Sequence, residues 1–325
     1  MNRKKVSGVA VIMLLCVSIA GCVSDRQRPP KMISVGYVST GITGLCVQVM
    51  QDQRIPEKQG LRIKYVGFTD PSALNNAFVL GKVDVNLAAG ANVIALARSQ
   101  GRKVQYFFPT LLNSVSVVVP QGSRARSLVD LKGKRIGWYG LQSGGGTAFY
   151  LVAQKHGLNA LKDFQMIDAK PPALWPLLER RQLDAVVIYE PFVSRMLATG
   201  KYRELVGPFW KEWEDKTGQK MEMTGLAASD EWLGQNAQMA KDLAAAWRDA
   251  ARFVQKNPEP VLAQYEQFTQ LKSKRELALG KKRIPAILVT SWGNLDESIA
   301  KSLQVLAKDK VMLQSVPPGT IRKIE

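Results

Sequence analysis

Short runs of β-branched and aromatic residues alternate along the chain with segments whose apolar residues recur at helical spacing. In the first half they predict strands at residues 32–39, 61–68, 83–88, 103–109 and 114–120. The intervening helices are expected at about 45–53, 73–80 and 92–100. Further on, strands are expected at 134–140, 164–169 and 183–190, and helices at about 147–155, 172–180 and 191–199. Such alternation is typical of an α/β fold with mainly parallel sheets covered by helices.

The second unit repeats the plan of the first. Residues 73–90 and 173–190 align without a gap, and the helix that follows each stretch ends in a glycine, Gly101 or Gly200. Two copies predict two similar lobes rather than a solenoid. Parallel α/β sheets bind ligands beyond the carboxyl ends of their strands, so the loops at those ends are the candidate site.

Composition narrows the functional classes. The 325 residues are 46% hydrophobic, enough to bury sizeable cores, and the net charge of +18 favours an anionic ligand or surface: small acids, membrane lipid or nucleic acid. His156 is the only histidine, which argues against His-rich metal sites. It precedes Gly157 at an expected helix end, where a capping role is favoured over catalysis. We predict no catalytic residue, no metal and no cofactor.

The N-terminal stretch predicts export. A basic start precedes an apolar run over residues 6–20, which is shorter than the roughly 20 residues of a membrane-spanning helix. The run ends in Ile-Ala-Gly-Cys, which resembles a bacterial lipobox cut before Cys22. That resemblance implies a signal peptide at 1–21, a lipid on Cys22, a tether at 22–31 and anchoring to a bacterial membrane. An uncleaved anchor and ordinary secretion are the alternatives.

Cys46 is left without a disulfide partner in this scheme. A small buried apolar residue is favoured over a reactive thiol.

The loop LQSGGGTAFY (141–150) leads from an expected strand into an expected helix. It lacks the Gly-Lys-Ser/Thr ending of a phosphate-binding P-loop. Its backbone N–H groups, with the Ser143 and Thr147 hydroxyls, fit an anion nest at the positive end of the helix. The alternative is a tight turn.

Other loop tips supply further candidates. The predicted ligand contacts are Ser39, Thr40, Gly41, Gly90, Asn92, Ser143, Gly144, Gly145, Gly146, Thr147, Glu190 and Thr224. Tyr37 and Trp138 are candidates for an aromatic wall, with core packing as the alternative. Glu190 would repel a bare anion, so it either accepts from a ligand ammonium or hydroxyl or pairs across the cleft with a basic residue.

Several segments together resemble a known family. The lipoprotein-like start, the SVGY strand, GKVDV (81–85), SLVDLKGKRIG (127–137), the Ser-Gly loop and IYEP (188–191) resemble ABC transporter solute-binding proteins of the nitrate, sulfonate and taurine class, also called NMT1/THI5-like. The resemblance implies a type II periplasmic-binding fold with a ligand cleft between two lobes. Lobe one would hold 32–118 and 222–325, lobe two 119–221, and the chain would cross near 117–121 and 221–228.

The resemblance also implies a function. It predicts a lipid-anchored, monomeric substrate-binding protein that closes on a small anionic or zwitterionic ligand and delivers it to ABC permease subunits, without enzymatic activity. The basic segment 272–283 is interpreted as solvated, and no nucleic-acid partner is expected for an exported protein. The alternatives are a binding subunit that feeds a sensor and a pyrimidine- or thiamine-precursor binding or synthase-like protein.

Overall fold

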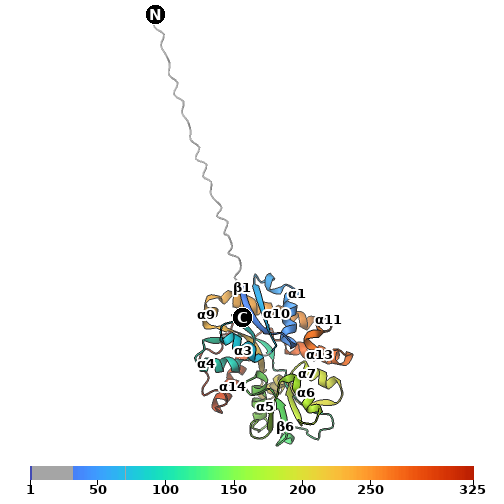
Figure 1. Cartoon of the computed structure of the whole chain (residues 1–325). Coiled ribbons are helices and arrows are strands. Elements are labelled where there is room, and N and C mark those ends of the chain that lie inside the picture. The colour runs from blue at the N-terminus through green and yellow to red at the C-terminus, as the bar shows by residue number, and fades with distance from the viewer. Residues whose placement is uncertain (2–31, 70) are drawn as a thin grey trace.

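Two five-stranded sheets organise the computed structural model, which describes Met1, residues 32–69 and residues 71–325 (Figure 1). The predicted signal peptide, Cys22 and the tether lie outside the described residues. Sheet A has the order β2 (Arg62–Phe68), β1 (Met32–Val38), β3 (Val85–Ala89), β10 (Glu222–Ser229) and β4 (Val104–Leu112). Sheet B has the order β7 (Gln165–Asp168), β6 (Arg135–Trp138), β8 (Ala185–Ile188), β5 (Ser116–Pro120) and β9 (Tyr202–Val206).

The two sheets follow one plan, as the internal repeat predicts. In each, three parallel strands are followed by a fourth, β10 or β5, that runs antiparallel to its neighbours on both sides. The repeated aspartates play the same role, since Asp84 accepts from the Ser34 N–H and Asp184 from the Arg135 N–H at the start of the neighbouring strand. Two α/β lobes are thus confirmed.

The chain passes between the sheets twice. It leaves sheet A at Leu112 and enters sheet B at Ser116, then leaves sheet B at Val206 and returns at Glu222. The return contains the helix α8 (Phe209–Thr217). The extended residues predicted as crossings, near 117–121 and 221–228, lie mostly within β5 and β10. The sequences of β5 and β10 resemble extended interlobe segments because the strands that pair with them are distant along the chain.

Helices cover both sheets. Those that follow the parallel strands are α1 (Gly41–Asp52), α3 (Pro71–Val79), α4 (Ala91–Ser99), α5 (Gly144–Lys155), α6 (Pro171–Glu179) and α7 (Phe192–Ala198), close to the predicted ranges. The shorter α2 (Ile55–Lys58) and the 3-10 turn η1 (Val129–Leu131) lie between them. No helix among the described residues has both the length and the apolar character needed to cross a membrane.

The C-terminal third adds helices that reach both lobes (Figure 1). They are α9 (Asp230–Gln235), α10 (Ala237–Lys256), α11 (Pro258–Gln264), α12 (Glu266–Thr269), α13 (Lys274–Ile287) and α14 (Leu295–Lys308). Helix α10 packs on α1, and α13 packs on α7 of the other lobe. Helix α14 contacts α4 and β10, while its Ser298 hydroxyl accepts from the Trp213 indole N–H of α8 at 3.2 Å.

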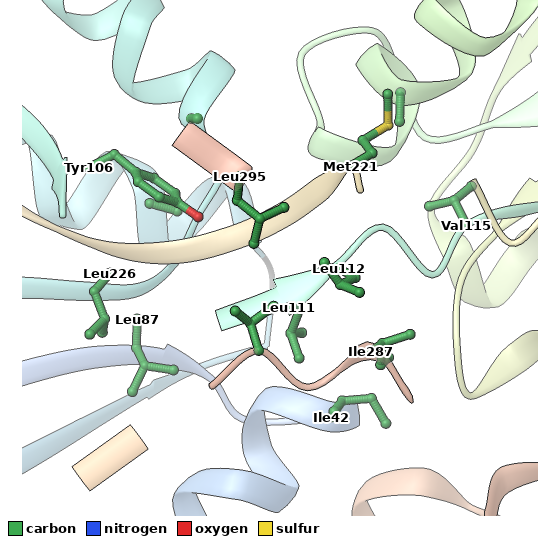
Figure 2. Packing of buried hydrophobic residues seen from close by; sticks show 14 of the residues in the cluster. Ile42, Leu87, Tyr106, Leu111, Leu112, Val115, Met221, Leu226, Ile287 and Leu295 are labelled. Atoms are coloured by element: carbon green, nitrogen blue, oxygen red, sulfur yellow. The ribbon is translucent and has the colours of Figure 1, made fainter. Parts of the chain in front are cut away.

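The crossings are part of the hydrophobic core rather than exposed links. Val115 in the first crossing and Met221 in the second are buried, in the same apolar cluster as Leu111 and Leu226 of sheet A (Figure 2). Cys46 is also fully buried, and burial raises its thiol pKa well above the ordinary value, which favours the structural interpretation of this residue over the reactive one.

Candidate ligand-binding site between the lobes

The N-termini of α4 and α5 meet where the two lobes face each other. The Asn92 side-chain amide donates to the Thr147 hydroxyl at 2.8 Å, and both residues are buried. The Thr147 hydroxyl donates in turn to the Leu141 carbonyl at 2.7 Å. The structure therefore brings two of the predicted ligand contacts, one from each lobe, directly together.

Ser143 is the N-cap of α5. Its hydroxyl accepts from the Gly146 N–H at 2.9 Å and donates to the Gly140 carbonyl at 2.8 Å. Helix geometry leaves the N–H groups of Gly144 and Gly145 without an acceptor inside α5. The loop is thus both a capped turn and a source of two backbone donors at a helix N-terminus.

Each of the three glycines lies where a side chain would collide. A Cβ on Gly144 would lie 2.9 Å from the Met223 carbonyl oxygen, which belongs to the other lobe's strand β10. A Cβ on Gly145 would overlap the Tyr139 hydroxyl, and one on Gly146 would overlap the Gly140 carbonyl. The bare backbone is therefore required by close packing, and at Gly144 that packing is between lobes.

Glu190 pairs with a cation from the other lobe. This buried carboxylate, between β8 and α7, is hydrogen-bonded to the Arg283 guanidinium of α13 and accepts from the Ser194 N–H at 3.2 Å. Arg283 also makes a bidentate pair with Glu204 of β9, at 3.0 and 2.8 Å. Of the two roles predicted for Glu190, the structure contains the pair across the lobes.

Sequence reasoning missed Arg283 because it lies in the basic segment interpreted as solvated. Burial lowers the pKa of its guanidinium, but hydrogen bonds and charges from Glu204 and Glu190 outweigh that effect and raise it. A signal was present, since Arg283 lies three residues after Gly280 and four before Ile287, on the face of α13 that is buried.

The remaining predicted residues of lobe one surround the ends of its strands. The Ser39 hydroxyl donates to the Phe68 carbonyl at 3.2 Å, and Thr40 is the exposed N-cap residue of α1 without a side-chain cap bond. Gly41 has a φ of 67°, which favours glycine. Gly90 is the N-cap residue of α4. The Thr224 hydroxyl lies 3.0 Å from the Thr110 hydroxyl, between β10 and β4.

The two aromatic candidates differ. Trp138 is buried and packs edge-to-face on Phe149, with ring centroids 6.4 Å apart, which fits the core-packing alternative. Tyr37 is half-buried and meets Tyr65 edge-to-face at 6.0 Å. Only Tyr37 keeps a surface that a ligand could reach.

A cavity of about 30 Å³ lies beside Asn92 and Thr147. Residues of α4, α5, α14 and the second crossing line it, among them Asn92, Gly144, Thr147 and Glu222. One carboxylate oxygen of Glu222 accepts from the Ala91 N–H at 3.3 Å. Burial raises the pKa of this carboxyl to about 8, despite hydrogen bonding that lowers it. Sequence reasoning missed Glu222 because its strand resembled a hinge segment.

The described residues contain no group of three or more His, Cys, Asp or Glu side chains arranged to hold a metal ion. His156 caps the far end of α5, and its Nε2 lies 2.8 Å from a Glu212 carboxylate oxygen.

Comparison with known proteins gives the family. The model of the NMT1/THI5-like family matches residues 57–261, well over half of the chain. The chain belongs to the NMT1/THI5-like family. The match holds Asn92, the glycine loop, Glu190 and Thr224, while Ser39, Thr40, Gly41 and Arg283 lie outside it. A comparison with curated protein sequences finds no match.

Solved structures share the fold of this NMT1/THI5-like chain. The alkanesulfonate-binding protein SsuA from Xanthomonas axonopodis pv. citri, bound to MOPS, matches with a TM-score of 0.75 and 17% identity over 91% of this chain and 100% of that one. The aliphatic sulphonate-binding protein SsuA from Escherichia coli matches with a TM-score of 0.72 and 16% identity over 90% and 95%. The nitrate-binding protein NrtA from Synechocystis PCC 6803 matches with a TM-score of 0.58 and 13% identity over 74% and 67%. The predicted periplasmic-binding fold is confirmed.

Proposed function

We propose that this NMT1/THI5-like protein binds a small organic anion between its lobes and serves as the substrate-binding component of an ABC importer. The observation that carries the proposal is the meeting of two helix N-termini, one from each lobe, at the Asn92–Thr147 contact. Helix N-termini favour anions because their backbone N–H groups and dipoles point outward. The folds shared with sulfonate- and nitrate-binding proteins support the same role.

Closure follows from the position of these groups. The N–H groups of Gly144 and Gly145 belong to lobe two, and the Asn92 amide belongs to lobe one. An anion that accepts from both sides stabilises the closed arrangement, since its contacts are complete only when the lobes approach. Thr40, Gly41 and Tyr37 are proposed to border the same ligand at the end of β1.

The membrane arrangement is proposed from the sequence. A lipid on Cys22, export by the signal peptide at 1–21 and a tether at 22–31 would hold a monomer beside its permease subunits. The lobe boundaries at 118/119 and 221/222 are part of the same proposal.

A binding assay tests the proposal. Purified protein lacking residues 1–22 is titrated with ethanesulfonate, nitrate, acetate, benzoate and thiamine precursors while thermal unfolding is followed. A ligand at a hundred times its Kd adds about 2.7 kcal/mol of stability, so an upward shift of Tm is expected for at least one anion. Stabilisation by neutral or cationic compounds alone would contradict the proposal.

Matched variants locate the site. Thr147→Val removes the hydroxyl between the lobes and is expected to reduce the ligand-induced shift. Thr199→Val is the control, because the Thr199 hydroxyl also donates to a backbone carbonyl at 2.7 Å but lies at the end of α7. If both variants lose the same part of the ligand-induced Tm shift, the N-terminus of α5 does not contact the ligand.

The synthase-like alternative depends on histidine chemistry. His156 lies at the opposite end of α5 from Gly144, about 18 Å away along a helix of 12 residues. Binding without turnover is therefore expected with every candidate ligand.

A further inference from the structure

A second cavity lies at the junction between lobe two and the C-terminal helix α14. Its volume is about 320 Å³, and its walls come from α5, α8 and α14. The described residues that line it are Lys155, Trp213, Thr217, Lys301, Gln304, Val305 and Lys308. It is separate from the cavity beside Asn92 and Thr147, because Lys155 is the last residue of α5 and Gly144 is the first, about 16 Å away along the helix.

The charged side chains that line this second cavity all carry positive charge. Three lysines line it and no aspartate or glutamate does, within the part of the chain that the structure describes. Lys301 and Lys308 are seven residues apart, so α14 presents them on one face, with about 10 Å of helix between them. Lys155 contributes from α5, and its ammonium nitrogen lies 5.2 Å from the centre of the Trp213 ring.

The acidic residues closest to these lysines in the chain are engaged elsewhere. Glu297, four residues before Lys301, has the spacing of an ordinary helical ion pair, but it accepts from the Gln219 side-chain amide at 2.9 Å. Asp309, which follows Lys308, accepts from side chains of α5. None of the ion pairs among the described residues includes Lys301 or Lys308.

Helix ends explain only part of this arrangement. Lysines are favoured in the last turn of a helix, because its dipole attracts cations. That accounts for Lys155 and Lys308, the last residues of α5 and α14, but not for Lys301 in the middle of α14. Three ammonium groups around one cavity repel one another, and an anion between them would replace this repulsion by attraction.

We propose that the cavity between α5, α8 and α14 binds a small anion with two or more negative charges, such as diphosphate or a tricarboxylate. The three ammonium groups and the exposed Gln304 amide supply the donors. The volume corresponds to about ten water molecules, which is enough for such an anion.

This second anion site goes beyond the proposed function, because its ligand is distinct from the one bound at the helix N-termini. It also has a consequence for the lobes. Helix α8 belongs to the second crossing and is joined to α14 by the hydrogen bond from Trp213 to Ser298. An anion that contacts both helices strengthens this junction, so it should stabilise the folded protein by mass action.

Calorimetric titration of the purified protein with sodium diphosphate at low ionic strength tests the inference. Lys301→Gln/Lys308→Gln removes two ammonium groups and keeps good helix formers. Since an exposed ion pair contributes at most about fivefold in affinity, the Kd should rise by about 20-fold. Lys241→Gln/Lys256→Gln on α10 is the control, with the same change of net charge at two exposed positions, and should change the Kd less than about twofold.

Three results of this titration would overturn the second anion site. They are the absence of diphosphate binding to the wild type, an equal loss in the two double variants, and equally tight binding of acetate. Acetate carries one charge, and it should bind about tenfold more weakly than diphosphate.

Amine labelling locates the bound diphosphate without any substitution. Acetylation of single lysines is followed by peptide mass spectrometry, with and without diphosphate. Labelling of Lys301 and Lys308 should slow at least about fivefold at saturation, whereas Lys256 should react at an unchanged rate. Equal protection of all three lysines, or of none, contradicts the proposal.

The Thr147→Val variant separates the two anion sites. It should bind diphosphate with the affinity of the wild type, because Thr147 lies near the opposite end of α5. A large loss in Thr147→Val with no loss in Lys301→Gln/Lys308→Gln places diphosphate at the helix N-termini. That result overturns the second site and leaves the proposed function intact.

Discussion

The Arg283 network allows a quantitative test of how the two lobes are held together. Arg283→Met keeps most of the apolar length of the side chain but removes the guanidinium. Glu190, whose side chain is 1% exposed, then loses its counter-ion, as does Glu204 at 21% exposure. The change therefore leaves two carboxylates without their cation, one of them fully buried.

The magnitude follows from this burial. Removal of one partner from a buried ion pair costs about 3–5 kcal/mol, because the remaining charge is left uncompensated. Arg283 itself is 19% exposed, so the lower end, about 3 kcal/mol, applies. At about 2 °C per kcal/mol for a chain of this size, Tm should fall by roughly 6 °C.

Thermal and urea unfolding measure the effect. The control is Arg252→Met, which breaks the exposed pair of Arg252 with Asp249, side chains 57% and 44% exposed, and should cost less than about 1 kcal/mol. The double variant Arg283→Met/Glu190→Gln should recover part of the loss, because the buried charge is gone. If Arg283→Met is as mild as Arg252→Met, the buried network does not stabilise this arrangement.

Three further predictions concern single positions. Gly145→Ala should destabilise the protein by about 1–3 kcal/mol in urea unfolding, because the new methyl overlaps Tyr139; an unchanged midpoint would contradict the packing. Ser273→Ala removes a capping box with Glu276 and should cost about 1 kcal/mol, whereas an unaffected Tm would mean that α13 does not depend on it. The raised pKa of Glu222 means that the folded state binds more protons than the unfolded state between about pH 4.5 and 8, so stability should decrease across that window. Glu222→Gln should flatten this decrease, which is at most a few kcal/mol, and a decrease equal to that of the wild type would refute the assignment.

Local patterns were enough to predict most of the fold. Parallel strands such as β3 and β8 are buried apolar runs, and the gapless alignment of 73–90 with 173–190 identified the shared plan of the lobes. Strand β10 looked like a hinge segment in the sequence because it pairs with β3 and β4 over a long sequence separation. Strand β9 was missed, since its residues YRELV carry charge and lack a clear alternation.

The residues of the candidate site also fall into those predictable from local sequence and those that depend on long-range packing. Residues at loop tips, such as Asn92 and Thr147, follow from the rule that parallel sheets bind ligands at their carboxyl ends. The positions of Arg283 and Glu222 near the site depend on which distant elements pack against those loop tips. A charged residue within a helix or an extended strand does not reveal which distant element it will approach. The glycines were recognised as unusual, but the groups that require them, Tyr139 and Met223, became visible only in the packing.

The antiparallel strand that is fourth of five in each sheet also has a consequence for the order of assembly. Strands β5 to β9 follow one another between residues 116 and 206, so sheet B has all its strands once that stretch has been synthesised. Sheet A has no link between β3 and β4 until β10 arrives after residue 222. The lobe whose first strand is synthesised first therefore completes its sheet last. During synthesis from the N-terminus, sheet A stays incomplete until all the strands of sheet B have been made.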